Sequence, residues 1–296
     1  MPADTQTTPA AQSGTITLGG DLTVNRLGFG AMRITGPGIW GPPADRDAAL
    51  ATLRRAVELG VNFIDTADSY GPDVSEELIA EALAPYPAGL VITTKVGWTR
   101  HGPGVWQHNA SPAHIQEAIE GSLKRLRLDR IDVYQLHVPD PATSFDASVE
   151  AIARLREQGK VRHVALSNVT LEHIRRAEKI VPIVSVQNRY SFSDREWDFV
   201  LDYCESSGIA FLPWGPMAQG KKANEAVERI AAARHTSTAV VSLAWLLRRS
   251  PVLLPIPGTS SVKHLEENVS AAAFRLSDAE FAQLNSVVPS PYWLRA

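Results

Sequence analysis

From Arg26 almost to its end, the chain alternates short β-branched runs with amphipathic helical patterns. Runs of this kind, bounded by Gly and Pro and separated by helices, are typical of parallel βαβ units. Strands are predicted over residues 26–31, 61–65, 90–95, 131–137, 161–167, 182–187, 209–213 and 252–256. Helices are predicted over 46–59, 75–83, 113–126, 147–158, a stretch capped by Thr170, 195–206, 223–234, 237–249 and 261–271. Eight strands, each followed by a helix, indicate a (β/α)8 TIM barrel rather than an open doubly wound sheet.

Two further patterns predict elements outside the barrel. Residues 15–18 and 22–24 are strand-like and flank a Gly-Gly turn, so we expect a small β-hairpin before the first barrel strand. An extra C-terminal helix is predicted over 278–287, where Ser277 and Glu280 have the spacing of a capping box.

Composition limits the function classes that the chain can belong to. Apolar residues make up 44% of it and the net charge is −3, with no long run of one sign, so we predict neither a nucleic-acid partner nor an anionic membrane. No apolar run reaches the roughly 18 residues of a membrane span. No linker divides the chain, so we expect a single domain over 15–296 behind a flexible tail over 1–14. The tail lacks the apolar segment of a secretory signal and Cys204 is the single cysteine, which fits a cytoplasmic protein.

Four polar residues stand at or just after the ends of three predicted strands. Asp65 and Tyr70 follow the strand over 61–65, Lys95 ends the next strand and His137 ends the third. Parallel neighbouring strands would bring these side chains to one rim, where α/β folds bind ligands.

This set of side chains suits proton donation to an oxygen. Tyrosine has a pKa of about 10, and an adjacent ammonium such as that of Lys95 makes its proton easier to give. Asp65 would hold the lysine charged, and His137 would orient a carbonyl or relay the proton. Taken alone, each of these residues is more often a structural salt-bridge, surface or core group. Polar residues at the same level on three different strands, however, favour a catalytic site. No Ser or Cys is placed as a nucleophile, so a hydride from a cofactor is the natural partner.

Several motifs in order resemble the aldo-keto reductase superfamily. They are DTADSYG, ITTKVG, YQLH, LSNV, SVQNRY and IPGTSSVKHLEENVSA, and the resemblance extends from Arg26 to about Ala273. It implies a (β/α)8 barrel that binds a nicotinamide cofactor without a Rossmann domain. It casts Tyr70 as general acid, Lys95 and Asp65 as its supporting pair, and His137 as the residue that orients the carbonyl.

The resemblance also implies a set of cofactor contacts. Ser167, Asn168 and Gln187 match the residues that bind the carboxamide, and Trp214 the aromatic that stacks on the nicotinamide. Glu267 and Asn268 match the adenine side. The loops after the seventh and eighth strands lie where barrels often bind phosphate, and they contain Gly215, Pro216, Met217, Gly220, Gly258, Thr259, Ser260 and Ser261. Gly28-Phe29-Gly30 is not a dinucleotide fingerprint because Arg33 replaces its third glycine, although Met32 and Arg33 are expected near the cofactor.

Two positions depart from the family pattern at the expected 2′-phosphate site. Many relatives have a basic residue in place of Gly258 and an arginine in place of His264. Ser260, Ser261 and Lys263 would then bind the phosphate of NADPH, or would serve only as a helix cap and a solvated lysine. We expect NADPH rather than NADH.

The stretch RLGFGAMRITGPGIWGPPADR resembles a bacterial branch that includes pyridoxal reductases. Trp40, Trp98 and Trp106 fall in predicted rim loops, and Trp293 in the tail, where they would form an aromatic substrate pocket or anchor loops. The favoured function is NAD(P)H-dependent reduction of a small-molecule aldehyde or ketone, without a metal, by a monomer or weak homo-oligomer. The alternative is a cofactor-binding partner subunit on the same fold, of the potassium-channel β-subunit kind.

Overall fold

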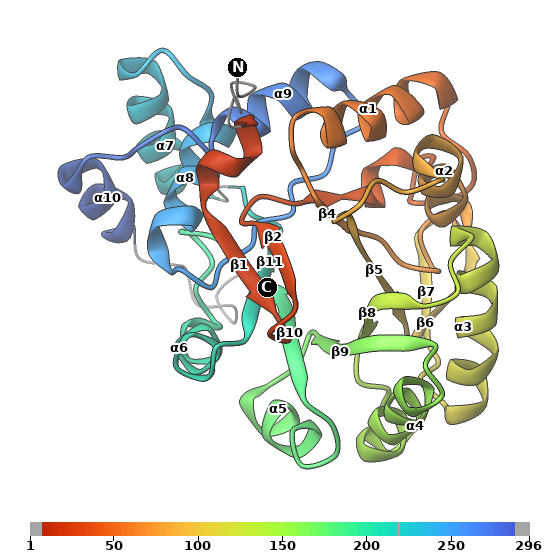
Figure 1. Cartoon of the computed structure of the whole chain (residues 1–296). Helices are drawn as coiled ribbons and strands as arrows, with labels where there is room; N and C mark the ends of the chain where they lie inside the picture. Colours follow the sequence, from red (N-terminus) through yellow and green to blue (C-terminus); the bar gives the residue numbers. More distant parts are fainter. Residues whose placement is uncertain (1–7, 218–219, 288–296) are drawn as a thin grey trace, which may run out of the picture.

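The computed structural model describes residues 8–217 and 220–287 as an α/β barrel (Figure 1). Seven of the described strands form one sheet in which every pair is parallel, in the order β11-β10-β9-β8-β5-β4-β3. The strands are β3 (Phe29–Gly30), β4 (Phe63–Asp65), β5 (Val91–Val96), β8 (Ile131–Leu136), β9 (Val161–Ser167), β10 (Ile183–Arg189) and β11 (Ala210–Trp214).

The segment expected as the eighth strand joins the two edges of this sheet without forming a regular strand. Leu254 donates to the carbonyl of Phe211 on β11, with an N–O distance of 2.9 Å, and Gly28 donates to the carbonyl of Pro255 at the same distance. Among the described residues, the one bridge of this segment pairs Phe211 with Leu253. The prediction of a strand over 252–256 was therefore not met, because prolines at 251, 255 and 257 lack the N–H groups that a ladder needs.

Helices cover the outside of the sheet, and most begin near the predicted residues. Ser111 caps the third helix and Thr170 the fifth, and the capping box of Ser277 and Glu280 is formed. The helices are α1 (Arg46–Glu58), α2 (Val74–Leu83), α3 (Pro112–Leu126), α4 (Phe145–Glu157), α5 (Leu171–Ala177), α6 (Asp198–Ser207), α7 (Lys221–Ala233), α8 (Thr238–Arg249), α9 (Val262–Ser270) and α10 (Asp278–Asn285).

A hairpin lies across the end of the barrel that faces the viewer in Figure 1. Its strands β1 (Thr15–Leu18) and β2 (Leu22–Asn25) pair antiparallel. Before it, a 3-10 helix over Pro9–Ser13 buries Ala10 fully, and the Ala10 N–H donates to the carbonyl of Leu59 at 3.0 Å. Part of the stretch that we expected as a flexible tail is thus folded onto the barrel.

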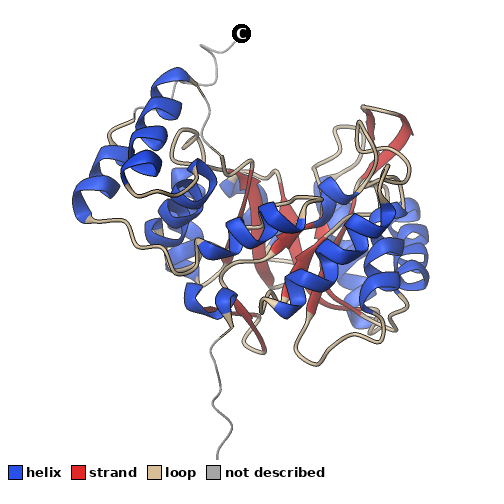
Figure 2. Cartoon of the chain, turned by 90° about the horizontal axis from the view of Figure 1, so that it is seen from above, coloured by secondary structure: helices blue, strands red, loops and turns tan. Residues whose placement is uncertain are grey.

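A second hairpin was expected as loop. Strands β6 (Trp98–Gly102) and β7 (Val105–His108) pair antiparallel, with Trp98 opposite His108 and Arg100 opposite Trp106. Figure 2 shows this hairpin projecting from the end of the barrel opposite β1 and β2. It therefore stands over the carboxyl ends of the barrel strands.

Within the described residues, no single helix has the length and apolar composition to cross a membrane. The pair α7 and α8 passes that test only together, and it is bent by 101°.

Candidate functional site

The four residues predicted at the strand ends meet at the rim of the barrel. Lys95 is fully buried, and its Nζ lies 2.7 Å from Asp65 Oδ2 and 3.2 Å from the Tyr70 hydroxyl. Lys95 also donates to the carbonyl of Thr66 at 2.8 Å. The Tyr70 and His137 rings lie edge to face with centroids 5.8 Å apart. Asp65, Tyr70, Lys95 and His137 therefore form one connected group.

Two glutamine amides complete the surroundings of Asp65. Its Oδ1 accepts a hydrogen bond of 2.9 Å from Gln135 and another of 2.9 Å from Gln187. A buried carboxylate needs hydrogen-bond donors for its oxygens, and here Lys95 and both amides supply them. Gln187 was expected among the carboxamide contacts, whereas sequence reasoning missed Gln135. The signal for it was a single amide inside the strand-like run IDVYQL.

Burial and charge together set the pKa values at this site. Burial raises the pKa of Tyr70 and outweighs the opposing effect of the Lys95 charge, so the phenol keeps its proton at neutral pH. Lys95 acts on the pKa of Tyr70 in the predicted direction, but burial outweighs its effect. Burial is the largest single effect and disfavours the Lys95 ammonium, but the charge interactions and hydrogen bonds with Asp65 and Tyr70 together outweigh it, so the pKa of Lys95 is raised. Burial, with the Lys95 charge, holds the pKa of His137 well below its usual value, so the imidazole is neutral.

Two tryptophans of the β6–β7 hairpin form a wall beside His137. The His137 ring centroid lies 6.4 Å from that of Trp98 and 6.5 Å from that of Trp106, with interplanar angles of 86° and 78°. Trp98 and Trp106 are themselves 5.8 Å apart. Trp40, expected in the same aromatic pocket, does not line the cavity described next, and its ring centroid lies 5.8 Å from the Arg100 Cζ.

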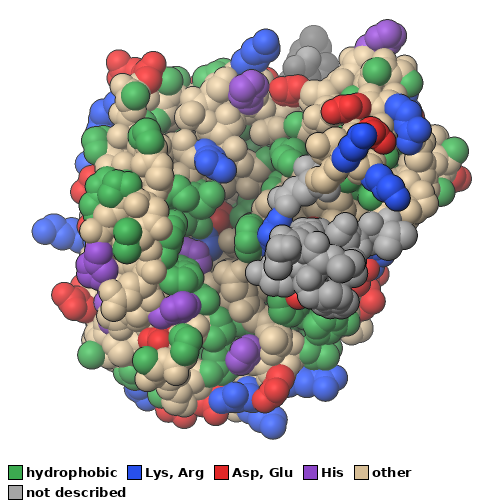
Figure 3. Space-filling model, turned by 180° about the vertical axis from the view of Figure 1, so that it is seen from behind, with side chains coloured by type: hydrophobic (Ala, Val, Ile, Leu, Met, Phe, Trp, Pro, Cys, Tyr) green, Lys and Arg blue, Asp and Glu red, His purple; other side chains and the backbone are tan. Residues whose placement is uncertain are grey.

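A cavity of about 850 Å³ opens over this group. Figure 3 shows this end of the molecule, where hydrophobic side chains surround a hollow and most charged side chains lie at the edge. The predicted site residues that line the cavity are Met32, Arg33, Asp65, Tyr70, Trp98, Trp106, His137, Ser167, Asn168, Gln187, Trp214, Gly215, Pro216, Met217 and Gly258.

Trp214 is oriented by a short chain of hydrogen bonds. Its Nε1 donates to Asn168 Oδ1 at 3.1 Å, and Asn168 Nδ2 donates to the His137 carbonyl at 3.0 Å and to Ser167 Oγ at 3.1 Å. Trp214 remains 39% exposed as a residue and lines the cavity. A flat aromatic ring held in this way offers one face to a planar group.

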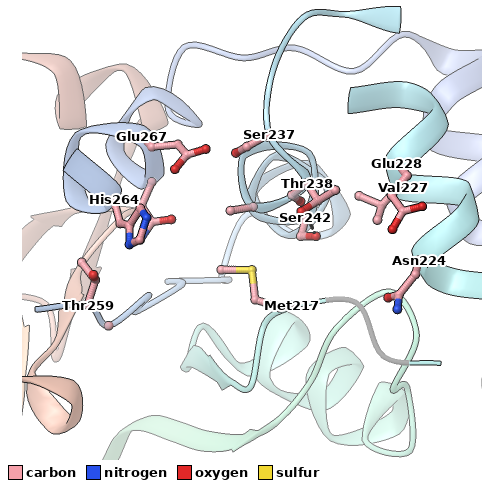
Figure 4. Close-up of a pocket in the computed structure, with 13 residues that line it drawn as sticks. Met217, Asn224, Val227, Glu228, Ser237, Thr238, Ser242, Thr259, His264 and Glu267 are labelled. Carbon is pink, nitrogen blue, oxygen red and sulfur yellow. Dashed lines mark hydrogen bonds between the residues drawn. The ribbon is translucent and has the colours of Figure 1, made fainter. Parts of the chain in front are cut away.

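A second cavity, of about 550 Å³, adjoins the first and is drawn in Figure 4. Met217 and Gly258 line both cavities. Side chains reach the second cavity from α7, α8 and α9, and the predicted residues among them are Thr259, His264, Glu267 and Asn268.

The remaining predicted positions lie apart from both cavities. Gly220 caps α7, Lys263 is exposed, and Ser261 caps α9 by accepting from the His264 N–H. Ser260 lines a third cavity of about 380 Å³, together with Met32 and Arg33. Trp293 lies outside the described residues.

Gly258 cannot carry the basic side chain found there in many relatives without a shift of the backbone. A Cβ at this position would come within 2.5 Å of the Gly30 carbonyl oxygen, and one at Gly30 within 2.6 Å of the Ile256 carbonyl oxygen. The last barrel segment thus packs directly on β3.

Comparison with known proteins found similar sequences and structures. The model of the Aldo/keto reductase family matches residues 26–289. The chain is 49% identical over 278 residues to an uncharacterized oxidoreductase of Schizosaccharomyces pombe, covering 93% of this chain and 90% of that protein. It is 43% identical over 282 residues to the pyridoxine 4-dehydrogenase of Escherichia coli, covering 93% of this chain and 98% of that protein. A crystal structure of an aldo-keto reductase from Klebsiella pneumoniae in complex with NADPH superposes with a TM-score of 0.78 at 26% identity, over 94% of this chain and 96% of that one.

Proposed function

The chain belongs to the aldo/keto reductase family, and from that premise we propose that it reduces an aldehyde or ketone to the alcohol with a reduced nicotinamide cofactor. The observation that carries the proposal is the buried Lys95 ammonium within hydrogen-bond distance of both Tyr70 and Asp65. The Tyr70 ring lines a cavity large enough for a cofactor ring and a small substrate.

Tyr70 acts as the general acid in this proposal. Its hydroxyl carries the proton at neutral pH and gives it to the carbonyl oxygen as negative charge develops there. The Lys95 ammonium then stabilises the phenolate at 3.2 Å, and Asp65 holds the lysine in place. The neutral His137 imidazole offers a hydrogen bond that orients the carbonyl.

The residues present fit a nicotinamide dinucleotide. Ser167, Asn168 and Gln187 bring hydroxyl and amide groups to the lining of the main cavity, and Trp214 adds a flat aromatic face to it. The two adjoining cavities provide an extended site rather than a compact one. The chemistry that such a cofactor supplies when bound is a hydride for the carbonyl carbon.

We propose NADPH as the preferred cofactor, with its 2′-phosphate near the start of α9. Free N–H groups and the helix dipole favour an anion there, and Arg33 lies beside Gly258, with its Cγ 3.6 Å from the position of a Cβ. The preference over NADH is expected to be modest, because Gly258 has no side chain and Lys263 is exposed.

The aromatic wall favours a planar carbonyl substrate. Trp98 and Trp106 line the cavity beside His137, and apolar rings bind well against such surfaces. The similarity to a pyridoxine 4-dehydrogenase supports a pyridine aldehyde such as pyridoxal as a member of the class.

The experiment that tests this proposal is a panel of aldehydes with NADPH or NADH, followed by loss of absorbance at about 340 nm, the reduced nicotinamide band. Turnover of aromatic aldehydes with NADPH is the expected result. A folded protein that binds the cofactor and reduces none of the aldehydes would contradict the proposal.

A further inference from the structure

A buried arginine joins the β6–β7 hairpin to the rim. Arg100 is 8% exposed, and its guanidinium donates to the carbonyls of Val105 at 3.0 Å, Ile39 at 2.8 Å, Ser69 at 3.0 Å and Gly38 at 3.0 Å. All four acceptors are backbone oxygens. One side chain therefore holds the facing strand of its own hairpin and two other segments of the chain.

These segments converge on the general acid. Ser69 immediately precedes Tyr70, and the loop that contains Gly38 is attached just after it, since the Gly41 N–H donates to the Gly71 carbonyl at 2.6 Å. Trp40 also forms a bridge with Gly71. Arg100 thus fixes the hairpin to the backbone on either side of Tyr70.

The loop bound by Arg100 contains a strained residue. Ile39 has a φ of 56°, in the left-handed region that a β-branched side chain rarely adopts. Such a residue persists only where its surroundings hold it, and strain of this kind often marks functional segments. The hydrogen bond from Arg100 to the Ile39 carbonyl is one of the contacts that hold it.

The same guanidinium also sets the position of the aromatic wall. Its Cζ lies 3.8 Å from the ring centroid of Trp106 and 5.8 Å from that of Trp40, close enough for cation–π attraction. Trp106 in turn packs edge-on against His137, so Arg100 is connected through Trp106 to the proposed catalytic group.

We propose that Arg100 is a positioning and specificity-determining residue of the reductase. It holds Trp98 and Trp106 at a fixed distance from Tyr70 and His137, so that an aromatic aldehyde is bound with its ring against the wall and its carbonyl at the acid. Short aliphatic aldehydes, which do not reach the wall, gain little from it. The inference rests on the proposed function, since it names the substrate class of that site.

The test compares Arg100→Met and Arg100→Lys with a matched control, Arg26→Met. Arg26 also donates to backbone carbonyls, those of Leu253, Leu247 and Ser250, but away from the hairpin. The measurements are kcat and KM for pyridine-4-carboxaldehyde and for propanal, together with hydrogen exchange of the amides of residues 98–108.

In Arg100→Met we expect kcat/KM for the aromatic aldehyde to fall about 10- to 100-fold, mostly through KM, against less than about threefold for propanal. The hairpin amides should exchange faster. Arg100→Lys should behave almost as Arg100→Met, because a single ammonium cannot reach four carbonyls. Arg26→Met should leave the ratio of the two substrates unchanged.

Equal losses of kcat/KM for both aldehydes, or unchanged amide exchange of the hairpin in Arg100→Met, would overturn this inference. The proposed reductase function would still stand. A wild-type protein that reduces neither aldehyde would instead contradict the proposed function, and the exchange measurement would still decide whether Arg100 holds the hairpin.

Discussion

The two ends of the barrel differ in what they bury. At the end covered by β1 and β2, Leu18, Leu22 and Val24 pack with inward-facing side chains such as Phe63 and Val133 in one apolar cluster. At the other end, polar and charged side chains are equally buried, and Asp65 accepts hydrogen bonds there from Lys95, Gln135 and Gln187. An apolar end stabilises the fold without specific partners, whereas the polar end depends on every partner being present.

The change from one kind of end to the other occurs along single strands. Alternate residues of a strand point to the same face, and within two to four residues that inward face changes from apolar to polar. The series are Phe63 and Asp65 on β4, Val91, Thr93 and Lys95 on β5, and Val133 and Gln135 on β8. The same strands therefore serve stability at one end and the proposed chemistry at the other.

Loss of Lys95 should affect the polar end most strongly. Lys95→Met leaves the Asp65 carboxylate buried without its cation, which we expect to cost about 3–5 kcal/mol of unfolding free energy. It should also lower kcat about 10²- to 10⁴-fold, because Tyr70 loses the charge that stabilises its phenolate. Denaturant unfolding and steady-state kinetics measure the two effects. Near-normal turnover by a folded Lys95→Met protein would contradict the role given to Lys95.

Loss of an apolar side chain at the end covered by β1 and β2 should lower the free energy of unfolding without lowering kcat. Leu18→Ala removes a side chain that is 1% exposed, and we expect the free energy of unfolding to fall by about 2–5 kcal/mol. The exposed Thr17→Ala on the same strand is the control and should change stability far less. Since neither residue touches the rim, kcat should stay within about twofold at a temperature where both variants are folded. A large drop in kcat for Leu18→Ala would show that the two ends are coupled.

The pH dependence should show almost no effect over the neutral range. Tyr70 must be protonated to reduce a carbonyl, and its pKa is raised, so the rate should decline only in the alkaline range above its usual pKa of about 10. His137, with its pKa lowered well below its usual value of about 6.5, stays neutral throughout. A profile of kcat/KM from about pH 6 to 9 should be flat. An acidic limb near 6.5 that His137→Gln removes would show that the imidazole titrates.

Much of the fold could be predicted from local pattern. Helix caps such as Ser111 and Ser277 have short-range signals, and both lie where they were expected. The segment over 252–256 could not be resolved by the same reasoning, because its apolar pattern is that of a strand while its prolines prevent regular pairing. The β6–β7 hairpin did have a signal, a Pro-Gly turn between WTR and VWQ, but it was read as part of a loop.

The part of the candidate site that lies at strand ends could be predicted, because the ends of the strands could be predicted from the sequence. Asp65, Lys95 and His137 come together because parallel strands end at one rim. Gln135 was missed because its partners, Asp65 and Thr93, lie on other strands, and only the closed barrel shows that they are its neighbours. The place of Arg100 depends on loops distant in sequence, and no spacing rule indicates it.

The most direct test of the account is a comparison of two tyrosines in the same barrel. Tyr70→Phe removes the proposed proton donor, while Tyr134→Phe removes a fully buried hydroxyl that has no hydrogen-bond partner among the described residues. The measurement is the single-turnover rate of an aromatic aldehyde with saturating reduced cofactor, along with cofactor affinity from tryptophan fluorescence.

We predict that Tyr70→Phe slows the turnover about 10²- to 10⁴-fold with its cofactor affinity preserved, and that Tyr134→Phe retains the wild-type rate. Tyr70→Phe turning over at close to the wild-type rate would contradict the assignment of Tyr70 as the general acid.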